Sequence, residues 1–112
     1  MIRKMYFKGG YLEGDDDLTS LKGHRSDVLV EDFHGFFYEL NFITPERVKS
    51  DLETNLLMGK CCFTDVGLVF IAEVKKSNII EVIKELDANG FFSSQKNIEI
   101  EVDENWYCEE LN

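Results

Sequence analysis

Residues 32–52, DFHGFFYELNFITPERVKSDL, constrain the fold more than any other stretch, because their hydrophobic period changes partway along. The first part alternates at every second position, which predicts a strand over 32–43 with one packed face and one partly wet face. Thr44 is then a natural N-cap and Pro45 suits the first helical position, so a helix is predicted over 44–59. Its apolar stripe would be Val48, Leu52 and Leu56. The chain therefore passes directly from a strand into a helix.

The rest of the chain adds further elements of both kinds. A short strand is predicted over 2–7, and the Gly-, Asp- and Ser-rich residues 11–31 are predicted to be a loop. Continuous apolar character over 68–72 indicates a central strand covered on both faces. A helix is predicted over 77–90, with Ser77 as its cap and an apolar stripe of Ile79, Val82, Ile83 and Leu86. Alternation over 98–103 predicts a strand with Ile98, Ile100 and Val102 inward and Glu99, Glu101 and Asp103 outward.

This order of elements predicts a single α+β domain over residues 1–112, with a mainly antiparallel sheet and about two helices packed on one face. The chain has 22 acidic and 12 basic residues, and its formal net charge is −10. Such a charge is unfavourable for binding nucleic acid or an anionic membrane, and it favours a basic protein partner. Three cysteines without metal-binding spacing, and no apolar segment at the N-terminus or of membrane-spanning length, predict a cytoplasmic protein.

Catalytic and cofactor motifs are missing from the sequence. There is no GxGxxG, Walker A loop or HExxH, and the acidic run at 15–17 lacks the spacing of a calcium-binding loop. We therefore expect neither cofactor, metal nor enzymatic activity. Two alternatives stay open: a small-ligand or regulatory domain with a pocket near His34 and Tyr38, and an enzyme that pairs one of its cysteines with His24 or His34.

Two segments combine acidic and aromatic residues, YLEGDDD near the N-terminus and DENWYCEEL near the C-terminus. Trp and Tyr are frequent anchors of protein interfaces, and surrounding carboxylates speed the encounter with a basic partner. Trp106 could instead seal the end of the core. The predicted partner contacts are Asp15, Asp16, Asp17, Glu104, Trp106, Tyr107, Glu109 and Glu110.

The stretch FFYELNFITPERVKSDL, followed by GLVFIAEVKKSNIIEVIKEL, resembles small cytosolic immunity proteins of bacterial toxin systems, including contact-dependent growth inhibition. The resemblance covers about residues 33–88 and is nearest to the immunity-protein-8 family. It implies a protein that binds a cognate toxin tightly and blocks its active site. Many such toxins are basic nucleases, against which an acidic inhibitor can place carboxylates where phosphates would otherwise bind.

Overall fold

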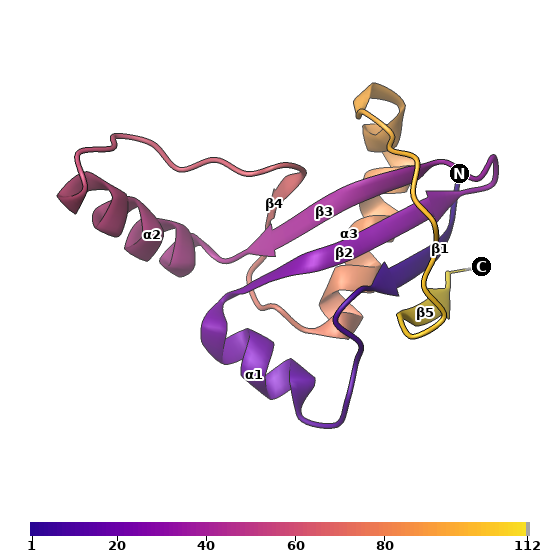
Figure 1. Ribbon diagram of the computed structural model, residues 1–112, viewed down its shortest axis with the longest axis horizontal. Helices are drawn as coiled ribbons and strands as arrows, with labels where there is room; N and C mark the ends of the chain where they lie inside the picture. The colour runs from indigo at the N-terminus through magenta and orange to yellow at the C-terminus, as the bar shows by residue number, and fades with distance from the viewer. Residues whose placement is uncertain (112) are drawn as a thin grey trace.

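A five-stranded sheet forms the centre of the protein in a computed structural model that describes residues 1–111 (Figure 1). In chain order the elements are β1 (Ile2–Phe7), α1 (Asp15–Lys22), β2 (His24–Asp32), β3 (Phe37–Ile43), α2 (Pro45–Leu57), β4 (Leu68–Phe70), α3 (Lys76–Ala88), the 3₁₀ helix η1 (Phe91–Ser94) and β5 (Tyr107–Glu110). The sheet order is β4-β3-β2-β1-β5.

The α+β class is confirmed, but the sheet is mixed and residues 1–111 contain three α-helices. β1, β2 and β3 form an antiparallel meander, and β5 pairs antiparallel with β1. β4 pairs with β3 in parallel. A parallel pair needs a crossover between its strands, and α2 with the segment after it provides that crossover. The expectation of about two helices on a mainly antiparallel sheet omitted α1 and this parallel pair.

α3 covers one face of the sheet, and the main core lies between them. Its apolar stripe is as predicted: Ile79 and Ile83 are fully buried against side chains from β1, β2 and β3. The opposite face carries a smaller apolar cluster of Tyr6, Leu29 and Phe37. No helix in the described part of the chain covers that cluster. The segment before β5 crosses it instead (Figure 1).

α2 begins as predicted but does not pack on the sheet. The Thr44 hydroxyl accepts the Arg47 N–H at 3.3 Å, and Pro45 is the first helical residue. No residue of α2 is fully buried, and the helix projects sideways from the sheet (Figure 1). Arg47 secures its base by donating to the Lys22 carbonyl and to Asp51, both at 2.9 Å. The expectation that the helices stack on one face therefore holds for α3 and is wrong for α2.

Residues 11–31 are not a loop, because they contain α1 and β2. Three acids in the first turn of α1 complement the positive end of its dipole, and Gly23 ends it with a positive φ of 74°. β2 lies in the middle of the sheet, where Val28, Leu29 and Val30 are all buried. These three residues are the whole apolar run of β2 and have polar residues on both sides, so the segment shows neither alternation nor a long apolar run.

The predicted strand over 32–43 is interrupted at its start by a turn. Asp32 is 1% exposed, and its Oδ1 accepts the backbone N–H groups of His34 at 2.8 Å and Phe36 at 3.0 Å. This carboxylate closes the turn between β2 and β3, so that β3 begins only at Phe37. His34 and Phe36 are exposed in the turn rather than part of a packed strand face.

Two other strand predictions are wrong in type or position. The predicted central strand over 68–72 is the three-residue edge strand β4, and Phe70 in it is 61% exposed. The predicted strand over 98–103 forms one isolated bridge, between Ile98 and Phe37. That segment lies across the face of the sheet, and Ile98 and Ile100 pack onto it as predicted without strand pairing. Val102, also predicted to face inward, is 41% exposed.

Candidate functional site

Lys76, the first residue of α3, joins the C-terminal strand to the helix. Its ammonium group donates hydrogen bonds to the Tyr107 hydroxyl and to Glu109 Oε1, both at 2.9 Å. The Tyr107 hydroxyl also donates to Glu109 Oε1, at 2.6 Å. Tyr107 and Glu109 are alternate residues of β5 and point to the same side of the sheet. β5 is therefore held by its ladder with β1 and by this contact with α3.

The loop before α1 reaches the same place. The Tyr11 ring centre lies 5.2 Å from that of Tyr107 and 4.7 Å from the Lys76 ammonium. The Tyr11 hydroxyl donates to Asp16 Oδ2, and the Lys76 backbone N–H donates to Asp16 Oδ1, both at 2.8 Å. Two acidic and aromatic segments from opposite ends of the sequence thus meet around one lysine. We call Tyr11, Asp16, Lys76, Tyr107 and Glu109 the Lys76 cluster.

The start of α3 also differs from its prediction. The helix begins at Lys76 with Lys75 as its N-cap residue, and no side-chain cap from its own segment is formed. Asp16 from α1 supplies the acceptor instead, close to the positive end of the helix dipole. The predicted cap at Ser77 is wrong because a carboxylate from another element takes this role.

Hydrogen bonds within the Lys76 cluster stabilise its charged forms. The bond to Tyr107, followed by that to Glu109, raises the pKa of Lys76 above its usual value. The bonds from Tyr107 and Lys76 lower the pKa of Glu109, although burial opposes the change. Burial is the largest reason why the pKa of Tyr107 is raised. At neutral pH Lys76 and Glu109 are therefore both charged and compensate each other.

The eight predicted contact residues divide into three groups. The first group forms hydrogen bonds within the protein. It consists of Asp15, which accepts the Leu12 N–H at 2.7 Å, and of three members of the Lys76 cluster: Asp16, Tyr107 and Glu109. Trp106 is half-buried. Those that are exposed and form no salt bridge within residues 1–111 are Asp17, Glu104 and Glu110. The structure brings together Asp16, Tyr107 and Glu109, and it leaves the three exposed acids free.

Residues 98–106, which we call the acidic strap, cross the sheet face opposite α3 (Figure 1). The Ile98 N–H donates to the Phe37 carbonyl at 2.8 Å and fixes one end of the strap to β3. At the other end the Trp106 ring meets Tyr6 of β1 edge-on, with ring centres 6.2 Å apart. The strap residues that pack on the apolar cluster of this face are Ile98, Ile100 and Trp106. The strap is thus anchored by its apolar side chains.

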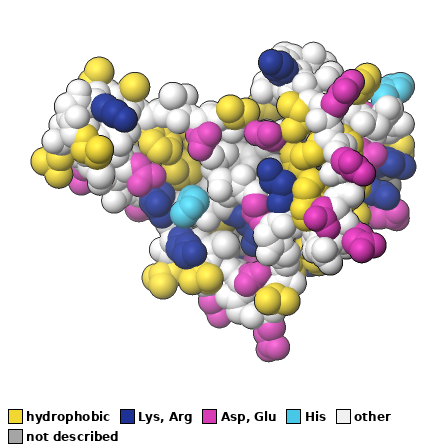
Figure 2. Space-filling view, in the orientation of Figure 1, with side chains coloured by type: hydrophobic (Ala, Val, Ile, Leu, Met, Phe, Trp, Pro, Cys, Tyr) yellow, Lys and Arg dark blue, Asp and Glu magenta, His cyan; other side chains and the backbone are white. Residues whose placement is uncertain are grey.

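The carboxylates of the strap point to solvent. Glu99, Glu101, Asp103 and Glu104 are exposed, and none of them forms a salt bridge in the part of the chain that the structure describes. No Lys or Arg follows Lys96 in the sequence. Figure 2 shows acidic side chains interspersed with hydrophobic ones over this part of the sheet. The alternation over 98–103 predicted that Glu99, Glu101 and Asp103 face outward. The predicted contact residues did not include them, although this pattern already indicated exposed carboxylates.

One carboxylate of the sheet under this face is neutralised internally. Glu31 is buried, and it accepts hydrogen bonds from Arg3 at 2.7 Å and from the Tyr6 hydroxyl at 2.8 Å. Burial by itself would raise the pKa of Glu31, but these two bonds lower it overall. Glu31 therefore adds no free negative charge to this face, whereas Glu39 of β3, which is exposed on the same face, adds its charge to those of the strap.

The features behind the two alternative functions lie elsewhere. A hollow of about 280 Å³ is lined by Tyr38, Leu40, Gly67 and Ile98 together with polar neighbours, while His34 lies in the exposed turn. All three cysteines are exposed free thiols. His24 accepts a hydrogen bond at Nδ1 from Arg47 at 2.9 Å, since a guanidinium only donates. That contact joins β2 to the base of α2.

Within residues 1–111, no cluster of three or more His, Cys, Asp or Glu side chains is arranged to hold a metal ion. In the same part of the chain, none of the helices has both the length and the apolar character needed to span a membrane. Comparison with known proteins finds no family model that matches the sequence, and no similar curated protein or solved structure.

The lowered pKa of Glu109 predicts a loss of stability in acid. A carboxylate whose pKa is lower in the folded protein stabilises it above the unfolded value of about 4.5, and this contribution is lost as the pH falls through the folded pKa. We expect Glu109→Gln to lower the free energy of unfolding by about 1–2 kcal/mol at pH 7 and by much less at pH 3. Urea denaturation at both pH values measures the difference.

The neighbouring exposed acid provides the control for this experiment. Glu110 has no salt bridge within the described residues, so Glu110→Gln should change stability little at either pH. A Glu109→Gln variant with the same loss at pH 7 and pH 3 would show that the ionised carboxylate does not stabilise the Lys76 cluster.

Proposed function

We propose that this chain is a non-catalytic immunity protein that binds and neutralises a cognate bacterial toxin, a basic nuclease, through the acidic strap. The observation that carries the proposal is the row of exposed carboxylates on the strap: Glu99, Glu101, Asp103 and Glu104. They have no basic partner within residues 1–111 and stand on a segment anchored to the sheet. A charged surface with no internal compensation is suited to a partner of opposite charge.

A nuclease must attract phosphate groups into its active-site cleft, so that cleft is basic. Along extended chain, alternate residues are about 6.6–6.8 Å apart and point to the same side. Glu99 and Glu101 alternate in this way with the half-buried Ile98 and Ile100, and the exposed Asp103 and Glu104 follow them. The strap therefore presents negative charges in a row, as a nucleic-acid strand does. An inhibitor of this form competes with the substrate by occupying the same basic groups.

Apolar groups beside the carboxylates supply the affinity that charge alone does not. Val102 is 41% exposed, and Trp106 is only partly covered by Tyr6. Interface hot spots are commonly aromatic side chains at the centre of a patch, with polar groups around them. Trp106 is the apolar anchor in this proposal. It is also one of the eight contact residues predicted from the sequence.

The resemblance of residues 33–88 to immunity proteins of bacterial toxin systems supports the same function. The stretch covers α2, α3 and the strands before them, so it concerns the scaffold rather than the strap. Three exposed free thiols suit a reducing compartment, which supports a location in the cytoplasm, where a delivered toxin would act.

The test is to sequence the genes on either side of the gene for this protein and to titrate the protein with any toxin domain that they encode. Calorimetry measures binding, and a nuclease assay measures inhibition. We expect binding tighter than micromolar and stoichiometric loss of nuclease activity. Binding without inhibition would refute neutralisation, and no binding at micromolar concentration would refute the function altogether.

A second candidate rests on the hollow beside Tyr38. Its volume of about 280 Å³ is close to the lower end of ligand pockets, which usually measure about 300–1,000 Å³. Glu39 and Lys96 add one charge of each sign to an otherwise mainly apolar lining. A small-ligand or regulatory domain is therefore the alternative, and a fragment screen by NMR tests it: shifts confined to these residues would favour it over the strap.

A further inference from the structure

We infer that the free edge of β4 and the groove beside it bind an extended, basic peptide segment as an added strand. This site lies at the edge of the sheet farthest from β5. It is independent of the acidic strap and does not rest on the function proposed for it.

One edge of β4 is hydrogen-bonded to β3, and the backbone groups of its other edge are free. Asn41 N–H donates to the Gly67 carbonyl, and Ile71 N–H donates to the Ile43 carbonyl, both at 2.9 Å. In a strand, the backbone N–H and C=O groups of alternate residues point to the same side. Those of residues 67, 69 and 71 therefore face β3. The N–H and C=O groups of Leu68 and Phe70 face away from β3, and none of them has a backbone partner within residues 1–111. An open row of this kind is a template for another strand.

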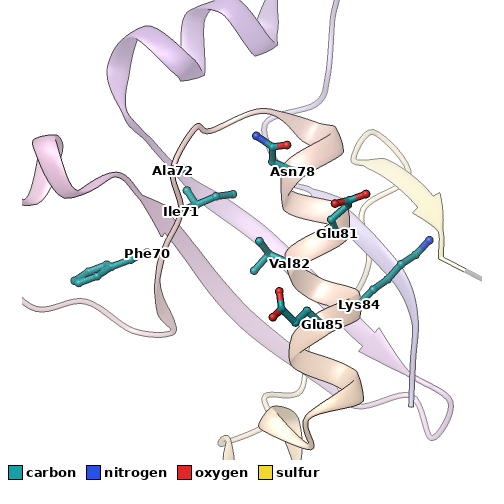
Figure 3. A pocket seen from close by; sticks show the side chains of 8 residues that line it. All are labelled: Phe70, Ile71, Ala72, Asn78, Glu81, Val82, Lys84 and Glu85. Atoms are coloured by element: carbon teal, nitrogen blue, oxygen red, sulfur yellow. The ribbon is translucent and has the colours of Figure 1, made fainter.

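The open edge borders a groove of about 660 Å³ between β4 and α3 (Figure 3). Ile71 points from the strand toward the helix and Val82 lies opposite it, so the floor is apolar. Glu81 and Glu85 stand one helical turn apart on α3 and line the groove, and both are exposed. Glu85 points toward β4, whereas Glu81 and Lys84 extend to the side of α3 away from Ile71 (Figure 3). Two acidic side chains and one basic side chain line the groove, so its net charge is negative.

The two sides of an added strand would meet different surfaces. Its side chains alternate, so one set faces α3 and the other faces the side on which Phe70 projects. The set toward α3 meets Glu85 in a groove of net negative charge, which favours Lys or Arg. The set on the other side meets the Phe70 ring, 61% exposed, which selects apolar residues. Strand addition derives affinity from the main chain and specificity from such alternate contacts.

The occupant is therefore a peptide segment that alternates apolar and basic residues, and not a second copy of this chain. A second copy carries the same net charge of −10. Its β4 edge would also bring its own Glu81 and Glu85 to the interface, and like charges placed together oppose association.

The experiment uses a synthetic eight-residue peptide of alternating valine and lysine with blocked ends, added to the ¹⁵N-labelled protein. We expect the amide signals of Leu68 and Phe70 to shift. A peptide with glutamate in place of lysine should bind at least about tenfold more weakly. The double variant Glu81→Gln/Glu85→Gln should reduce the difference between the two peptides. Equal binding of both peptides to the unmodified protein would overturn the proposal.

Two further comparisons test strand addition itself. Methylating the backbone nitrogens of one alternate set of peptide residues should weaken binding at least about tenfold, because those nitrogens face β4; methylating the other set should not. Phe70→Pro removes an outward N–H and should abolish binding, whereas Phe70→Thr keeps that N–H and should weaken it less. Equal binding of both methylated peptides would overturn the proposal. So would a dimer of the free protein that Phe70→Pro converts to monomer, since the edge would then bind a second copy.

Discussion

Gly67→Ala should be among the most damaging single substitutions in the protein, lowering the free energy of unfolding by about 2–5 kcal/mol. Gly67 has a positive φ of 62°, which an L side chain adopts at a cost. A Cβ at this position would also collide with the backbone carbonyl of Glu39, where no flexible side chain can yield. To relieve the collision β4 must move away from β3. Urea denaturation, with hydrogen exchange at the Ile71 amide, measures both effects.

Gly35→Ala separates backbone strain from the collision. Gly35 has a φ of 84°, but a Cβ there would meet no atom within 4 Å. This control should lower the free energy of unfolding by about 1–2 kcal/mol, which is the contribution of backbone strain alone. Equal losses for the two variants would show that β4 does not pack closely on β3. The proposed peptide site at the β4 edge would then lack a fixed strand to build on.

The elements that sequence predicted correctly are those with local signals. Thr44 and Pro45 mark the start of α2 through a cap and a fixed φ, which depend only on neighbouring residues. α3 was predicted from the spacing of Ile79 and Ile83, which are both fully buried. In each case the periodicity and the terminus lie within one segment, so no knowledge of the rest of the fold was needed.

The errors concern features decided by distant residues. β2 was missed because its burial on both faces depends on strands from elsewhere in the chain. The cap of α3 comes from Asp16, sixty residues away along the chain, and no local pattern announces it. The apolar sequence of β4 predicted a central strand. Its position at the edge of the sheet depends instead on which strand pairs with β3.

The sequence predicted which kinds of residue form the candidate site, but not where in the fold they lie. Asp16, Tyr107 and Glu109 have the acidic and aromatic character expected of contacts, yet all three form hydrogen bonds with Lys76 inside the protein. A lysine on another element cannot be matched to them from sequence. A row of free carboxylates lies on the strap, where Ile98 and Ile100 indicated that Glu99 and Glu101 point outward.

The double variant Glu99→Gln/Glu101→Gln should slow association with the toxin nuclease about tenfold or more at low salt. Long-range attraction between charged surfaces raises association rates by about 10–10³-fold, and this gain disappears when the charges are removed or screened. The variant should also flatten the salt dependence of the rate. Dissociation should change less, because the apolar anchor Trp106 remains. Stopped-flow mixing at two ionic strengths measures each quantity.

The matched control removes the same charge from another surface. Glu46 and Glu53 are exposed on α2, so Glu46→Gln/Glu53→Gln changes the net charge from −10 to −8, as the strap variant does. If attraction came only from net charge, both variants would slow association equally. If the strap itself faces the basic cleft, the strap variant should be several-fold slower, because screening over about 10 Å at 0.1 M salt favours the nearest charges. Equal slowing would place the interface away from the strap.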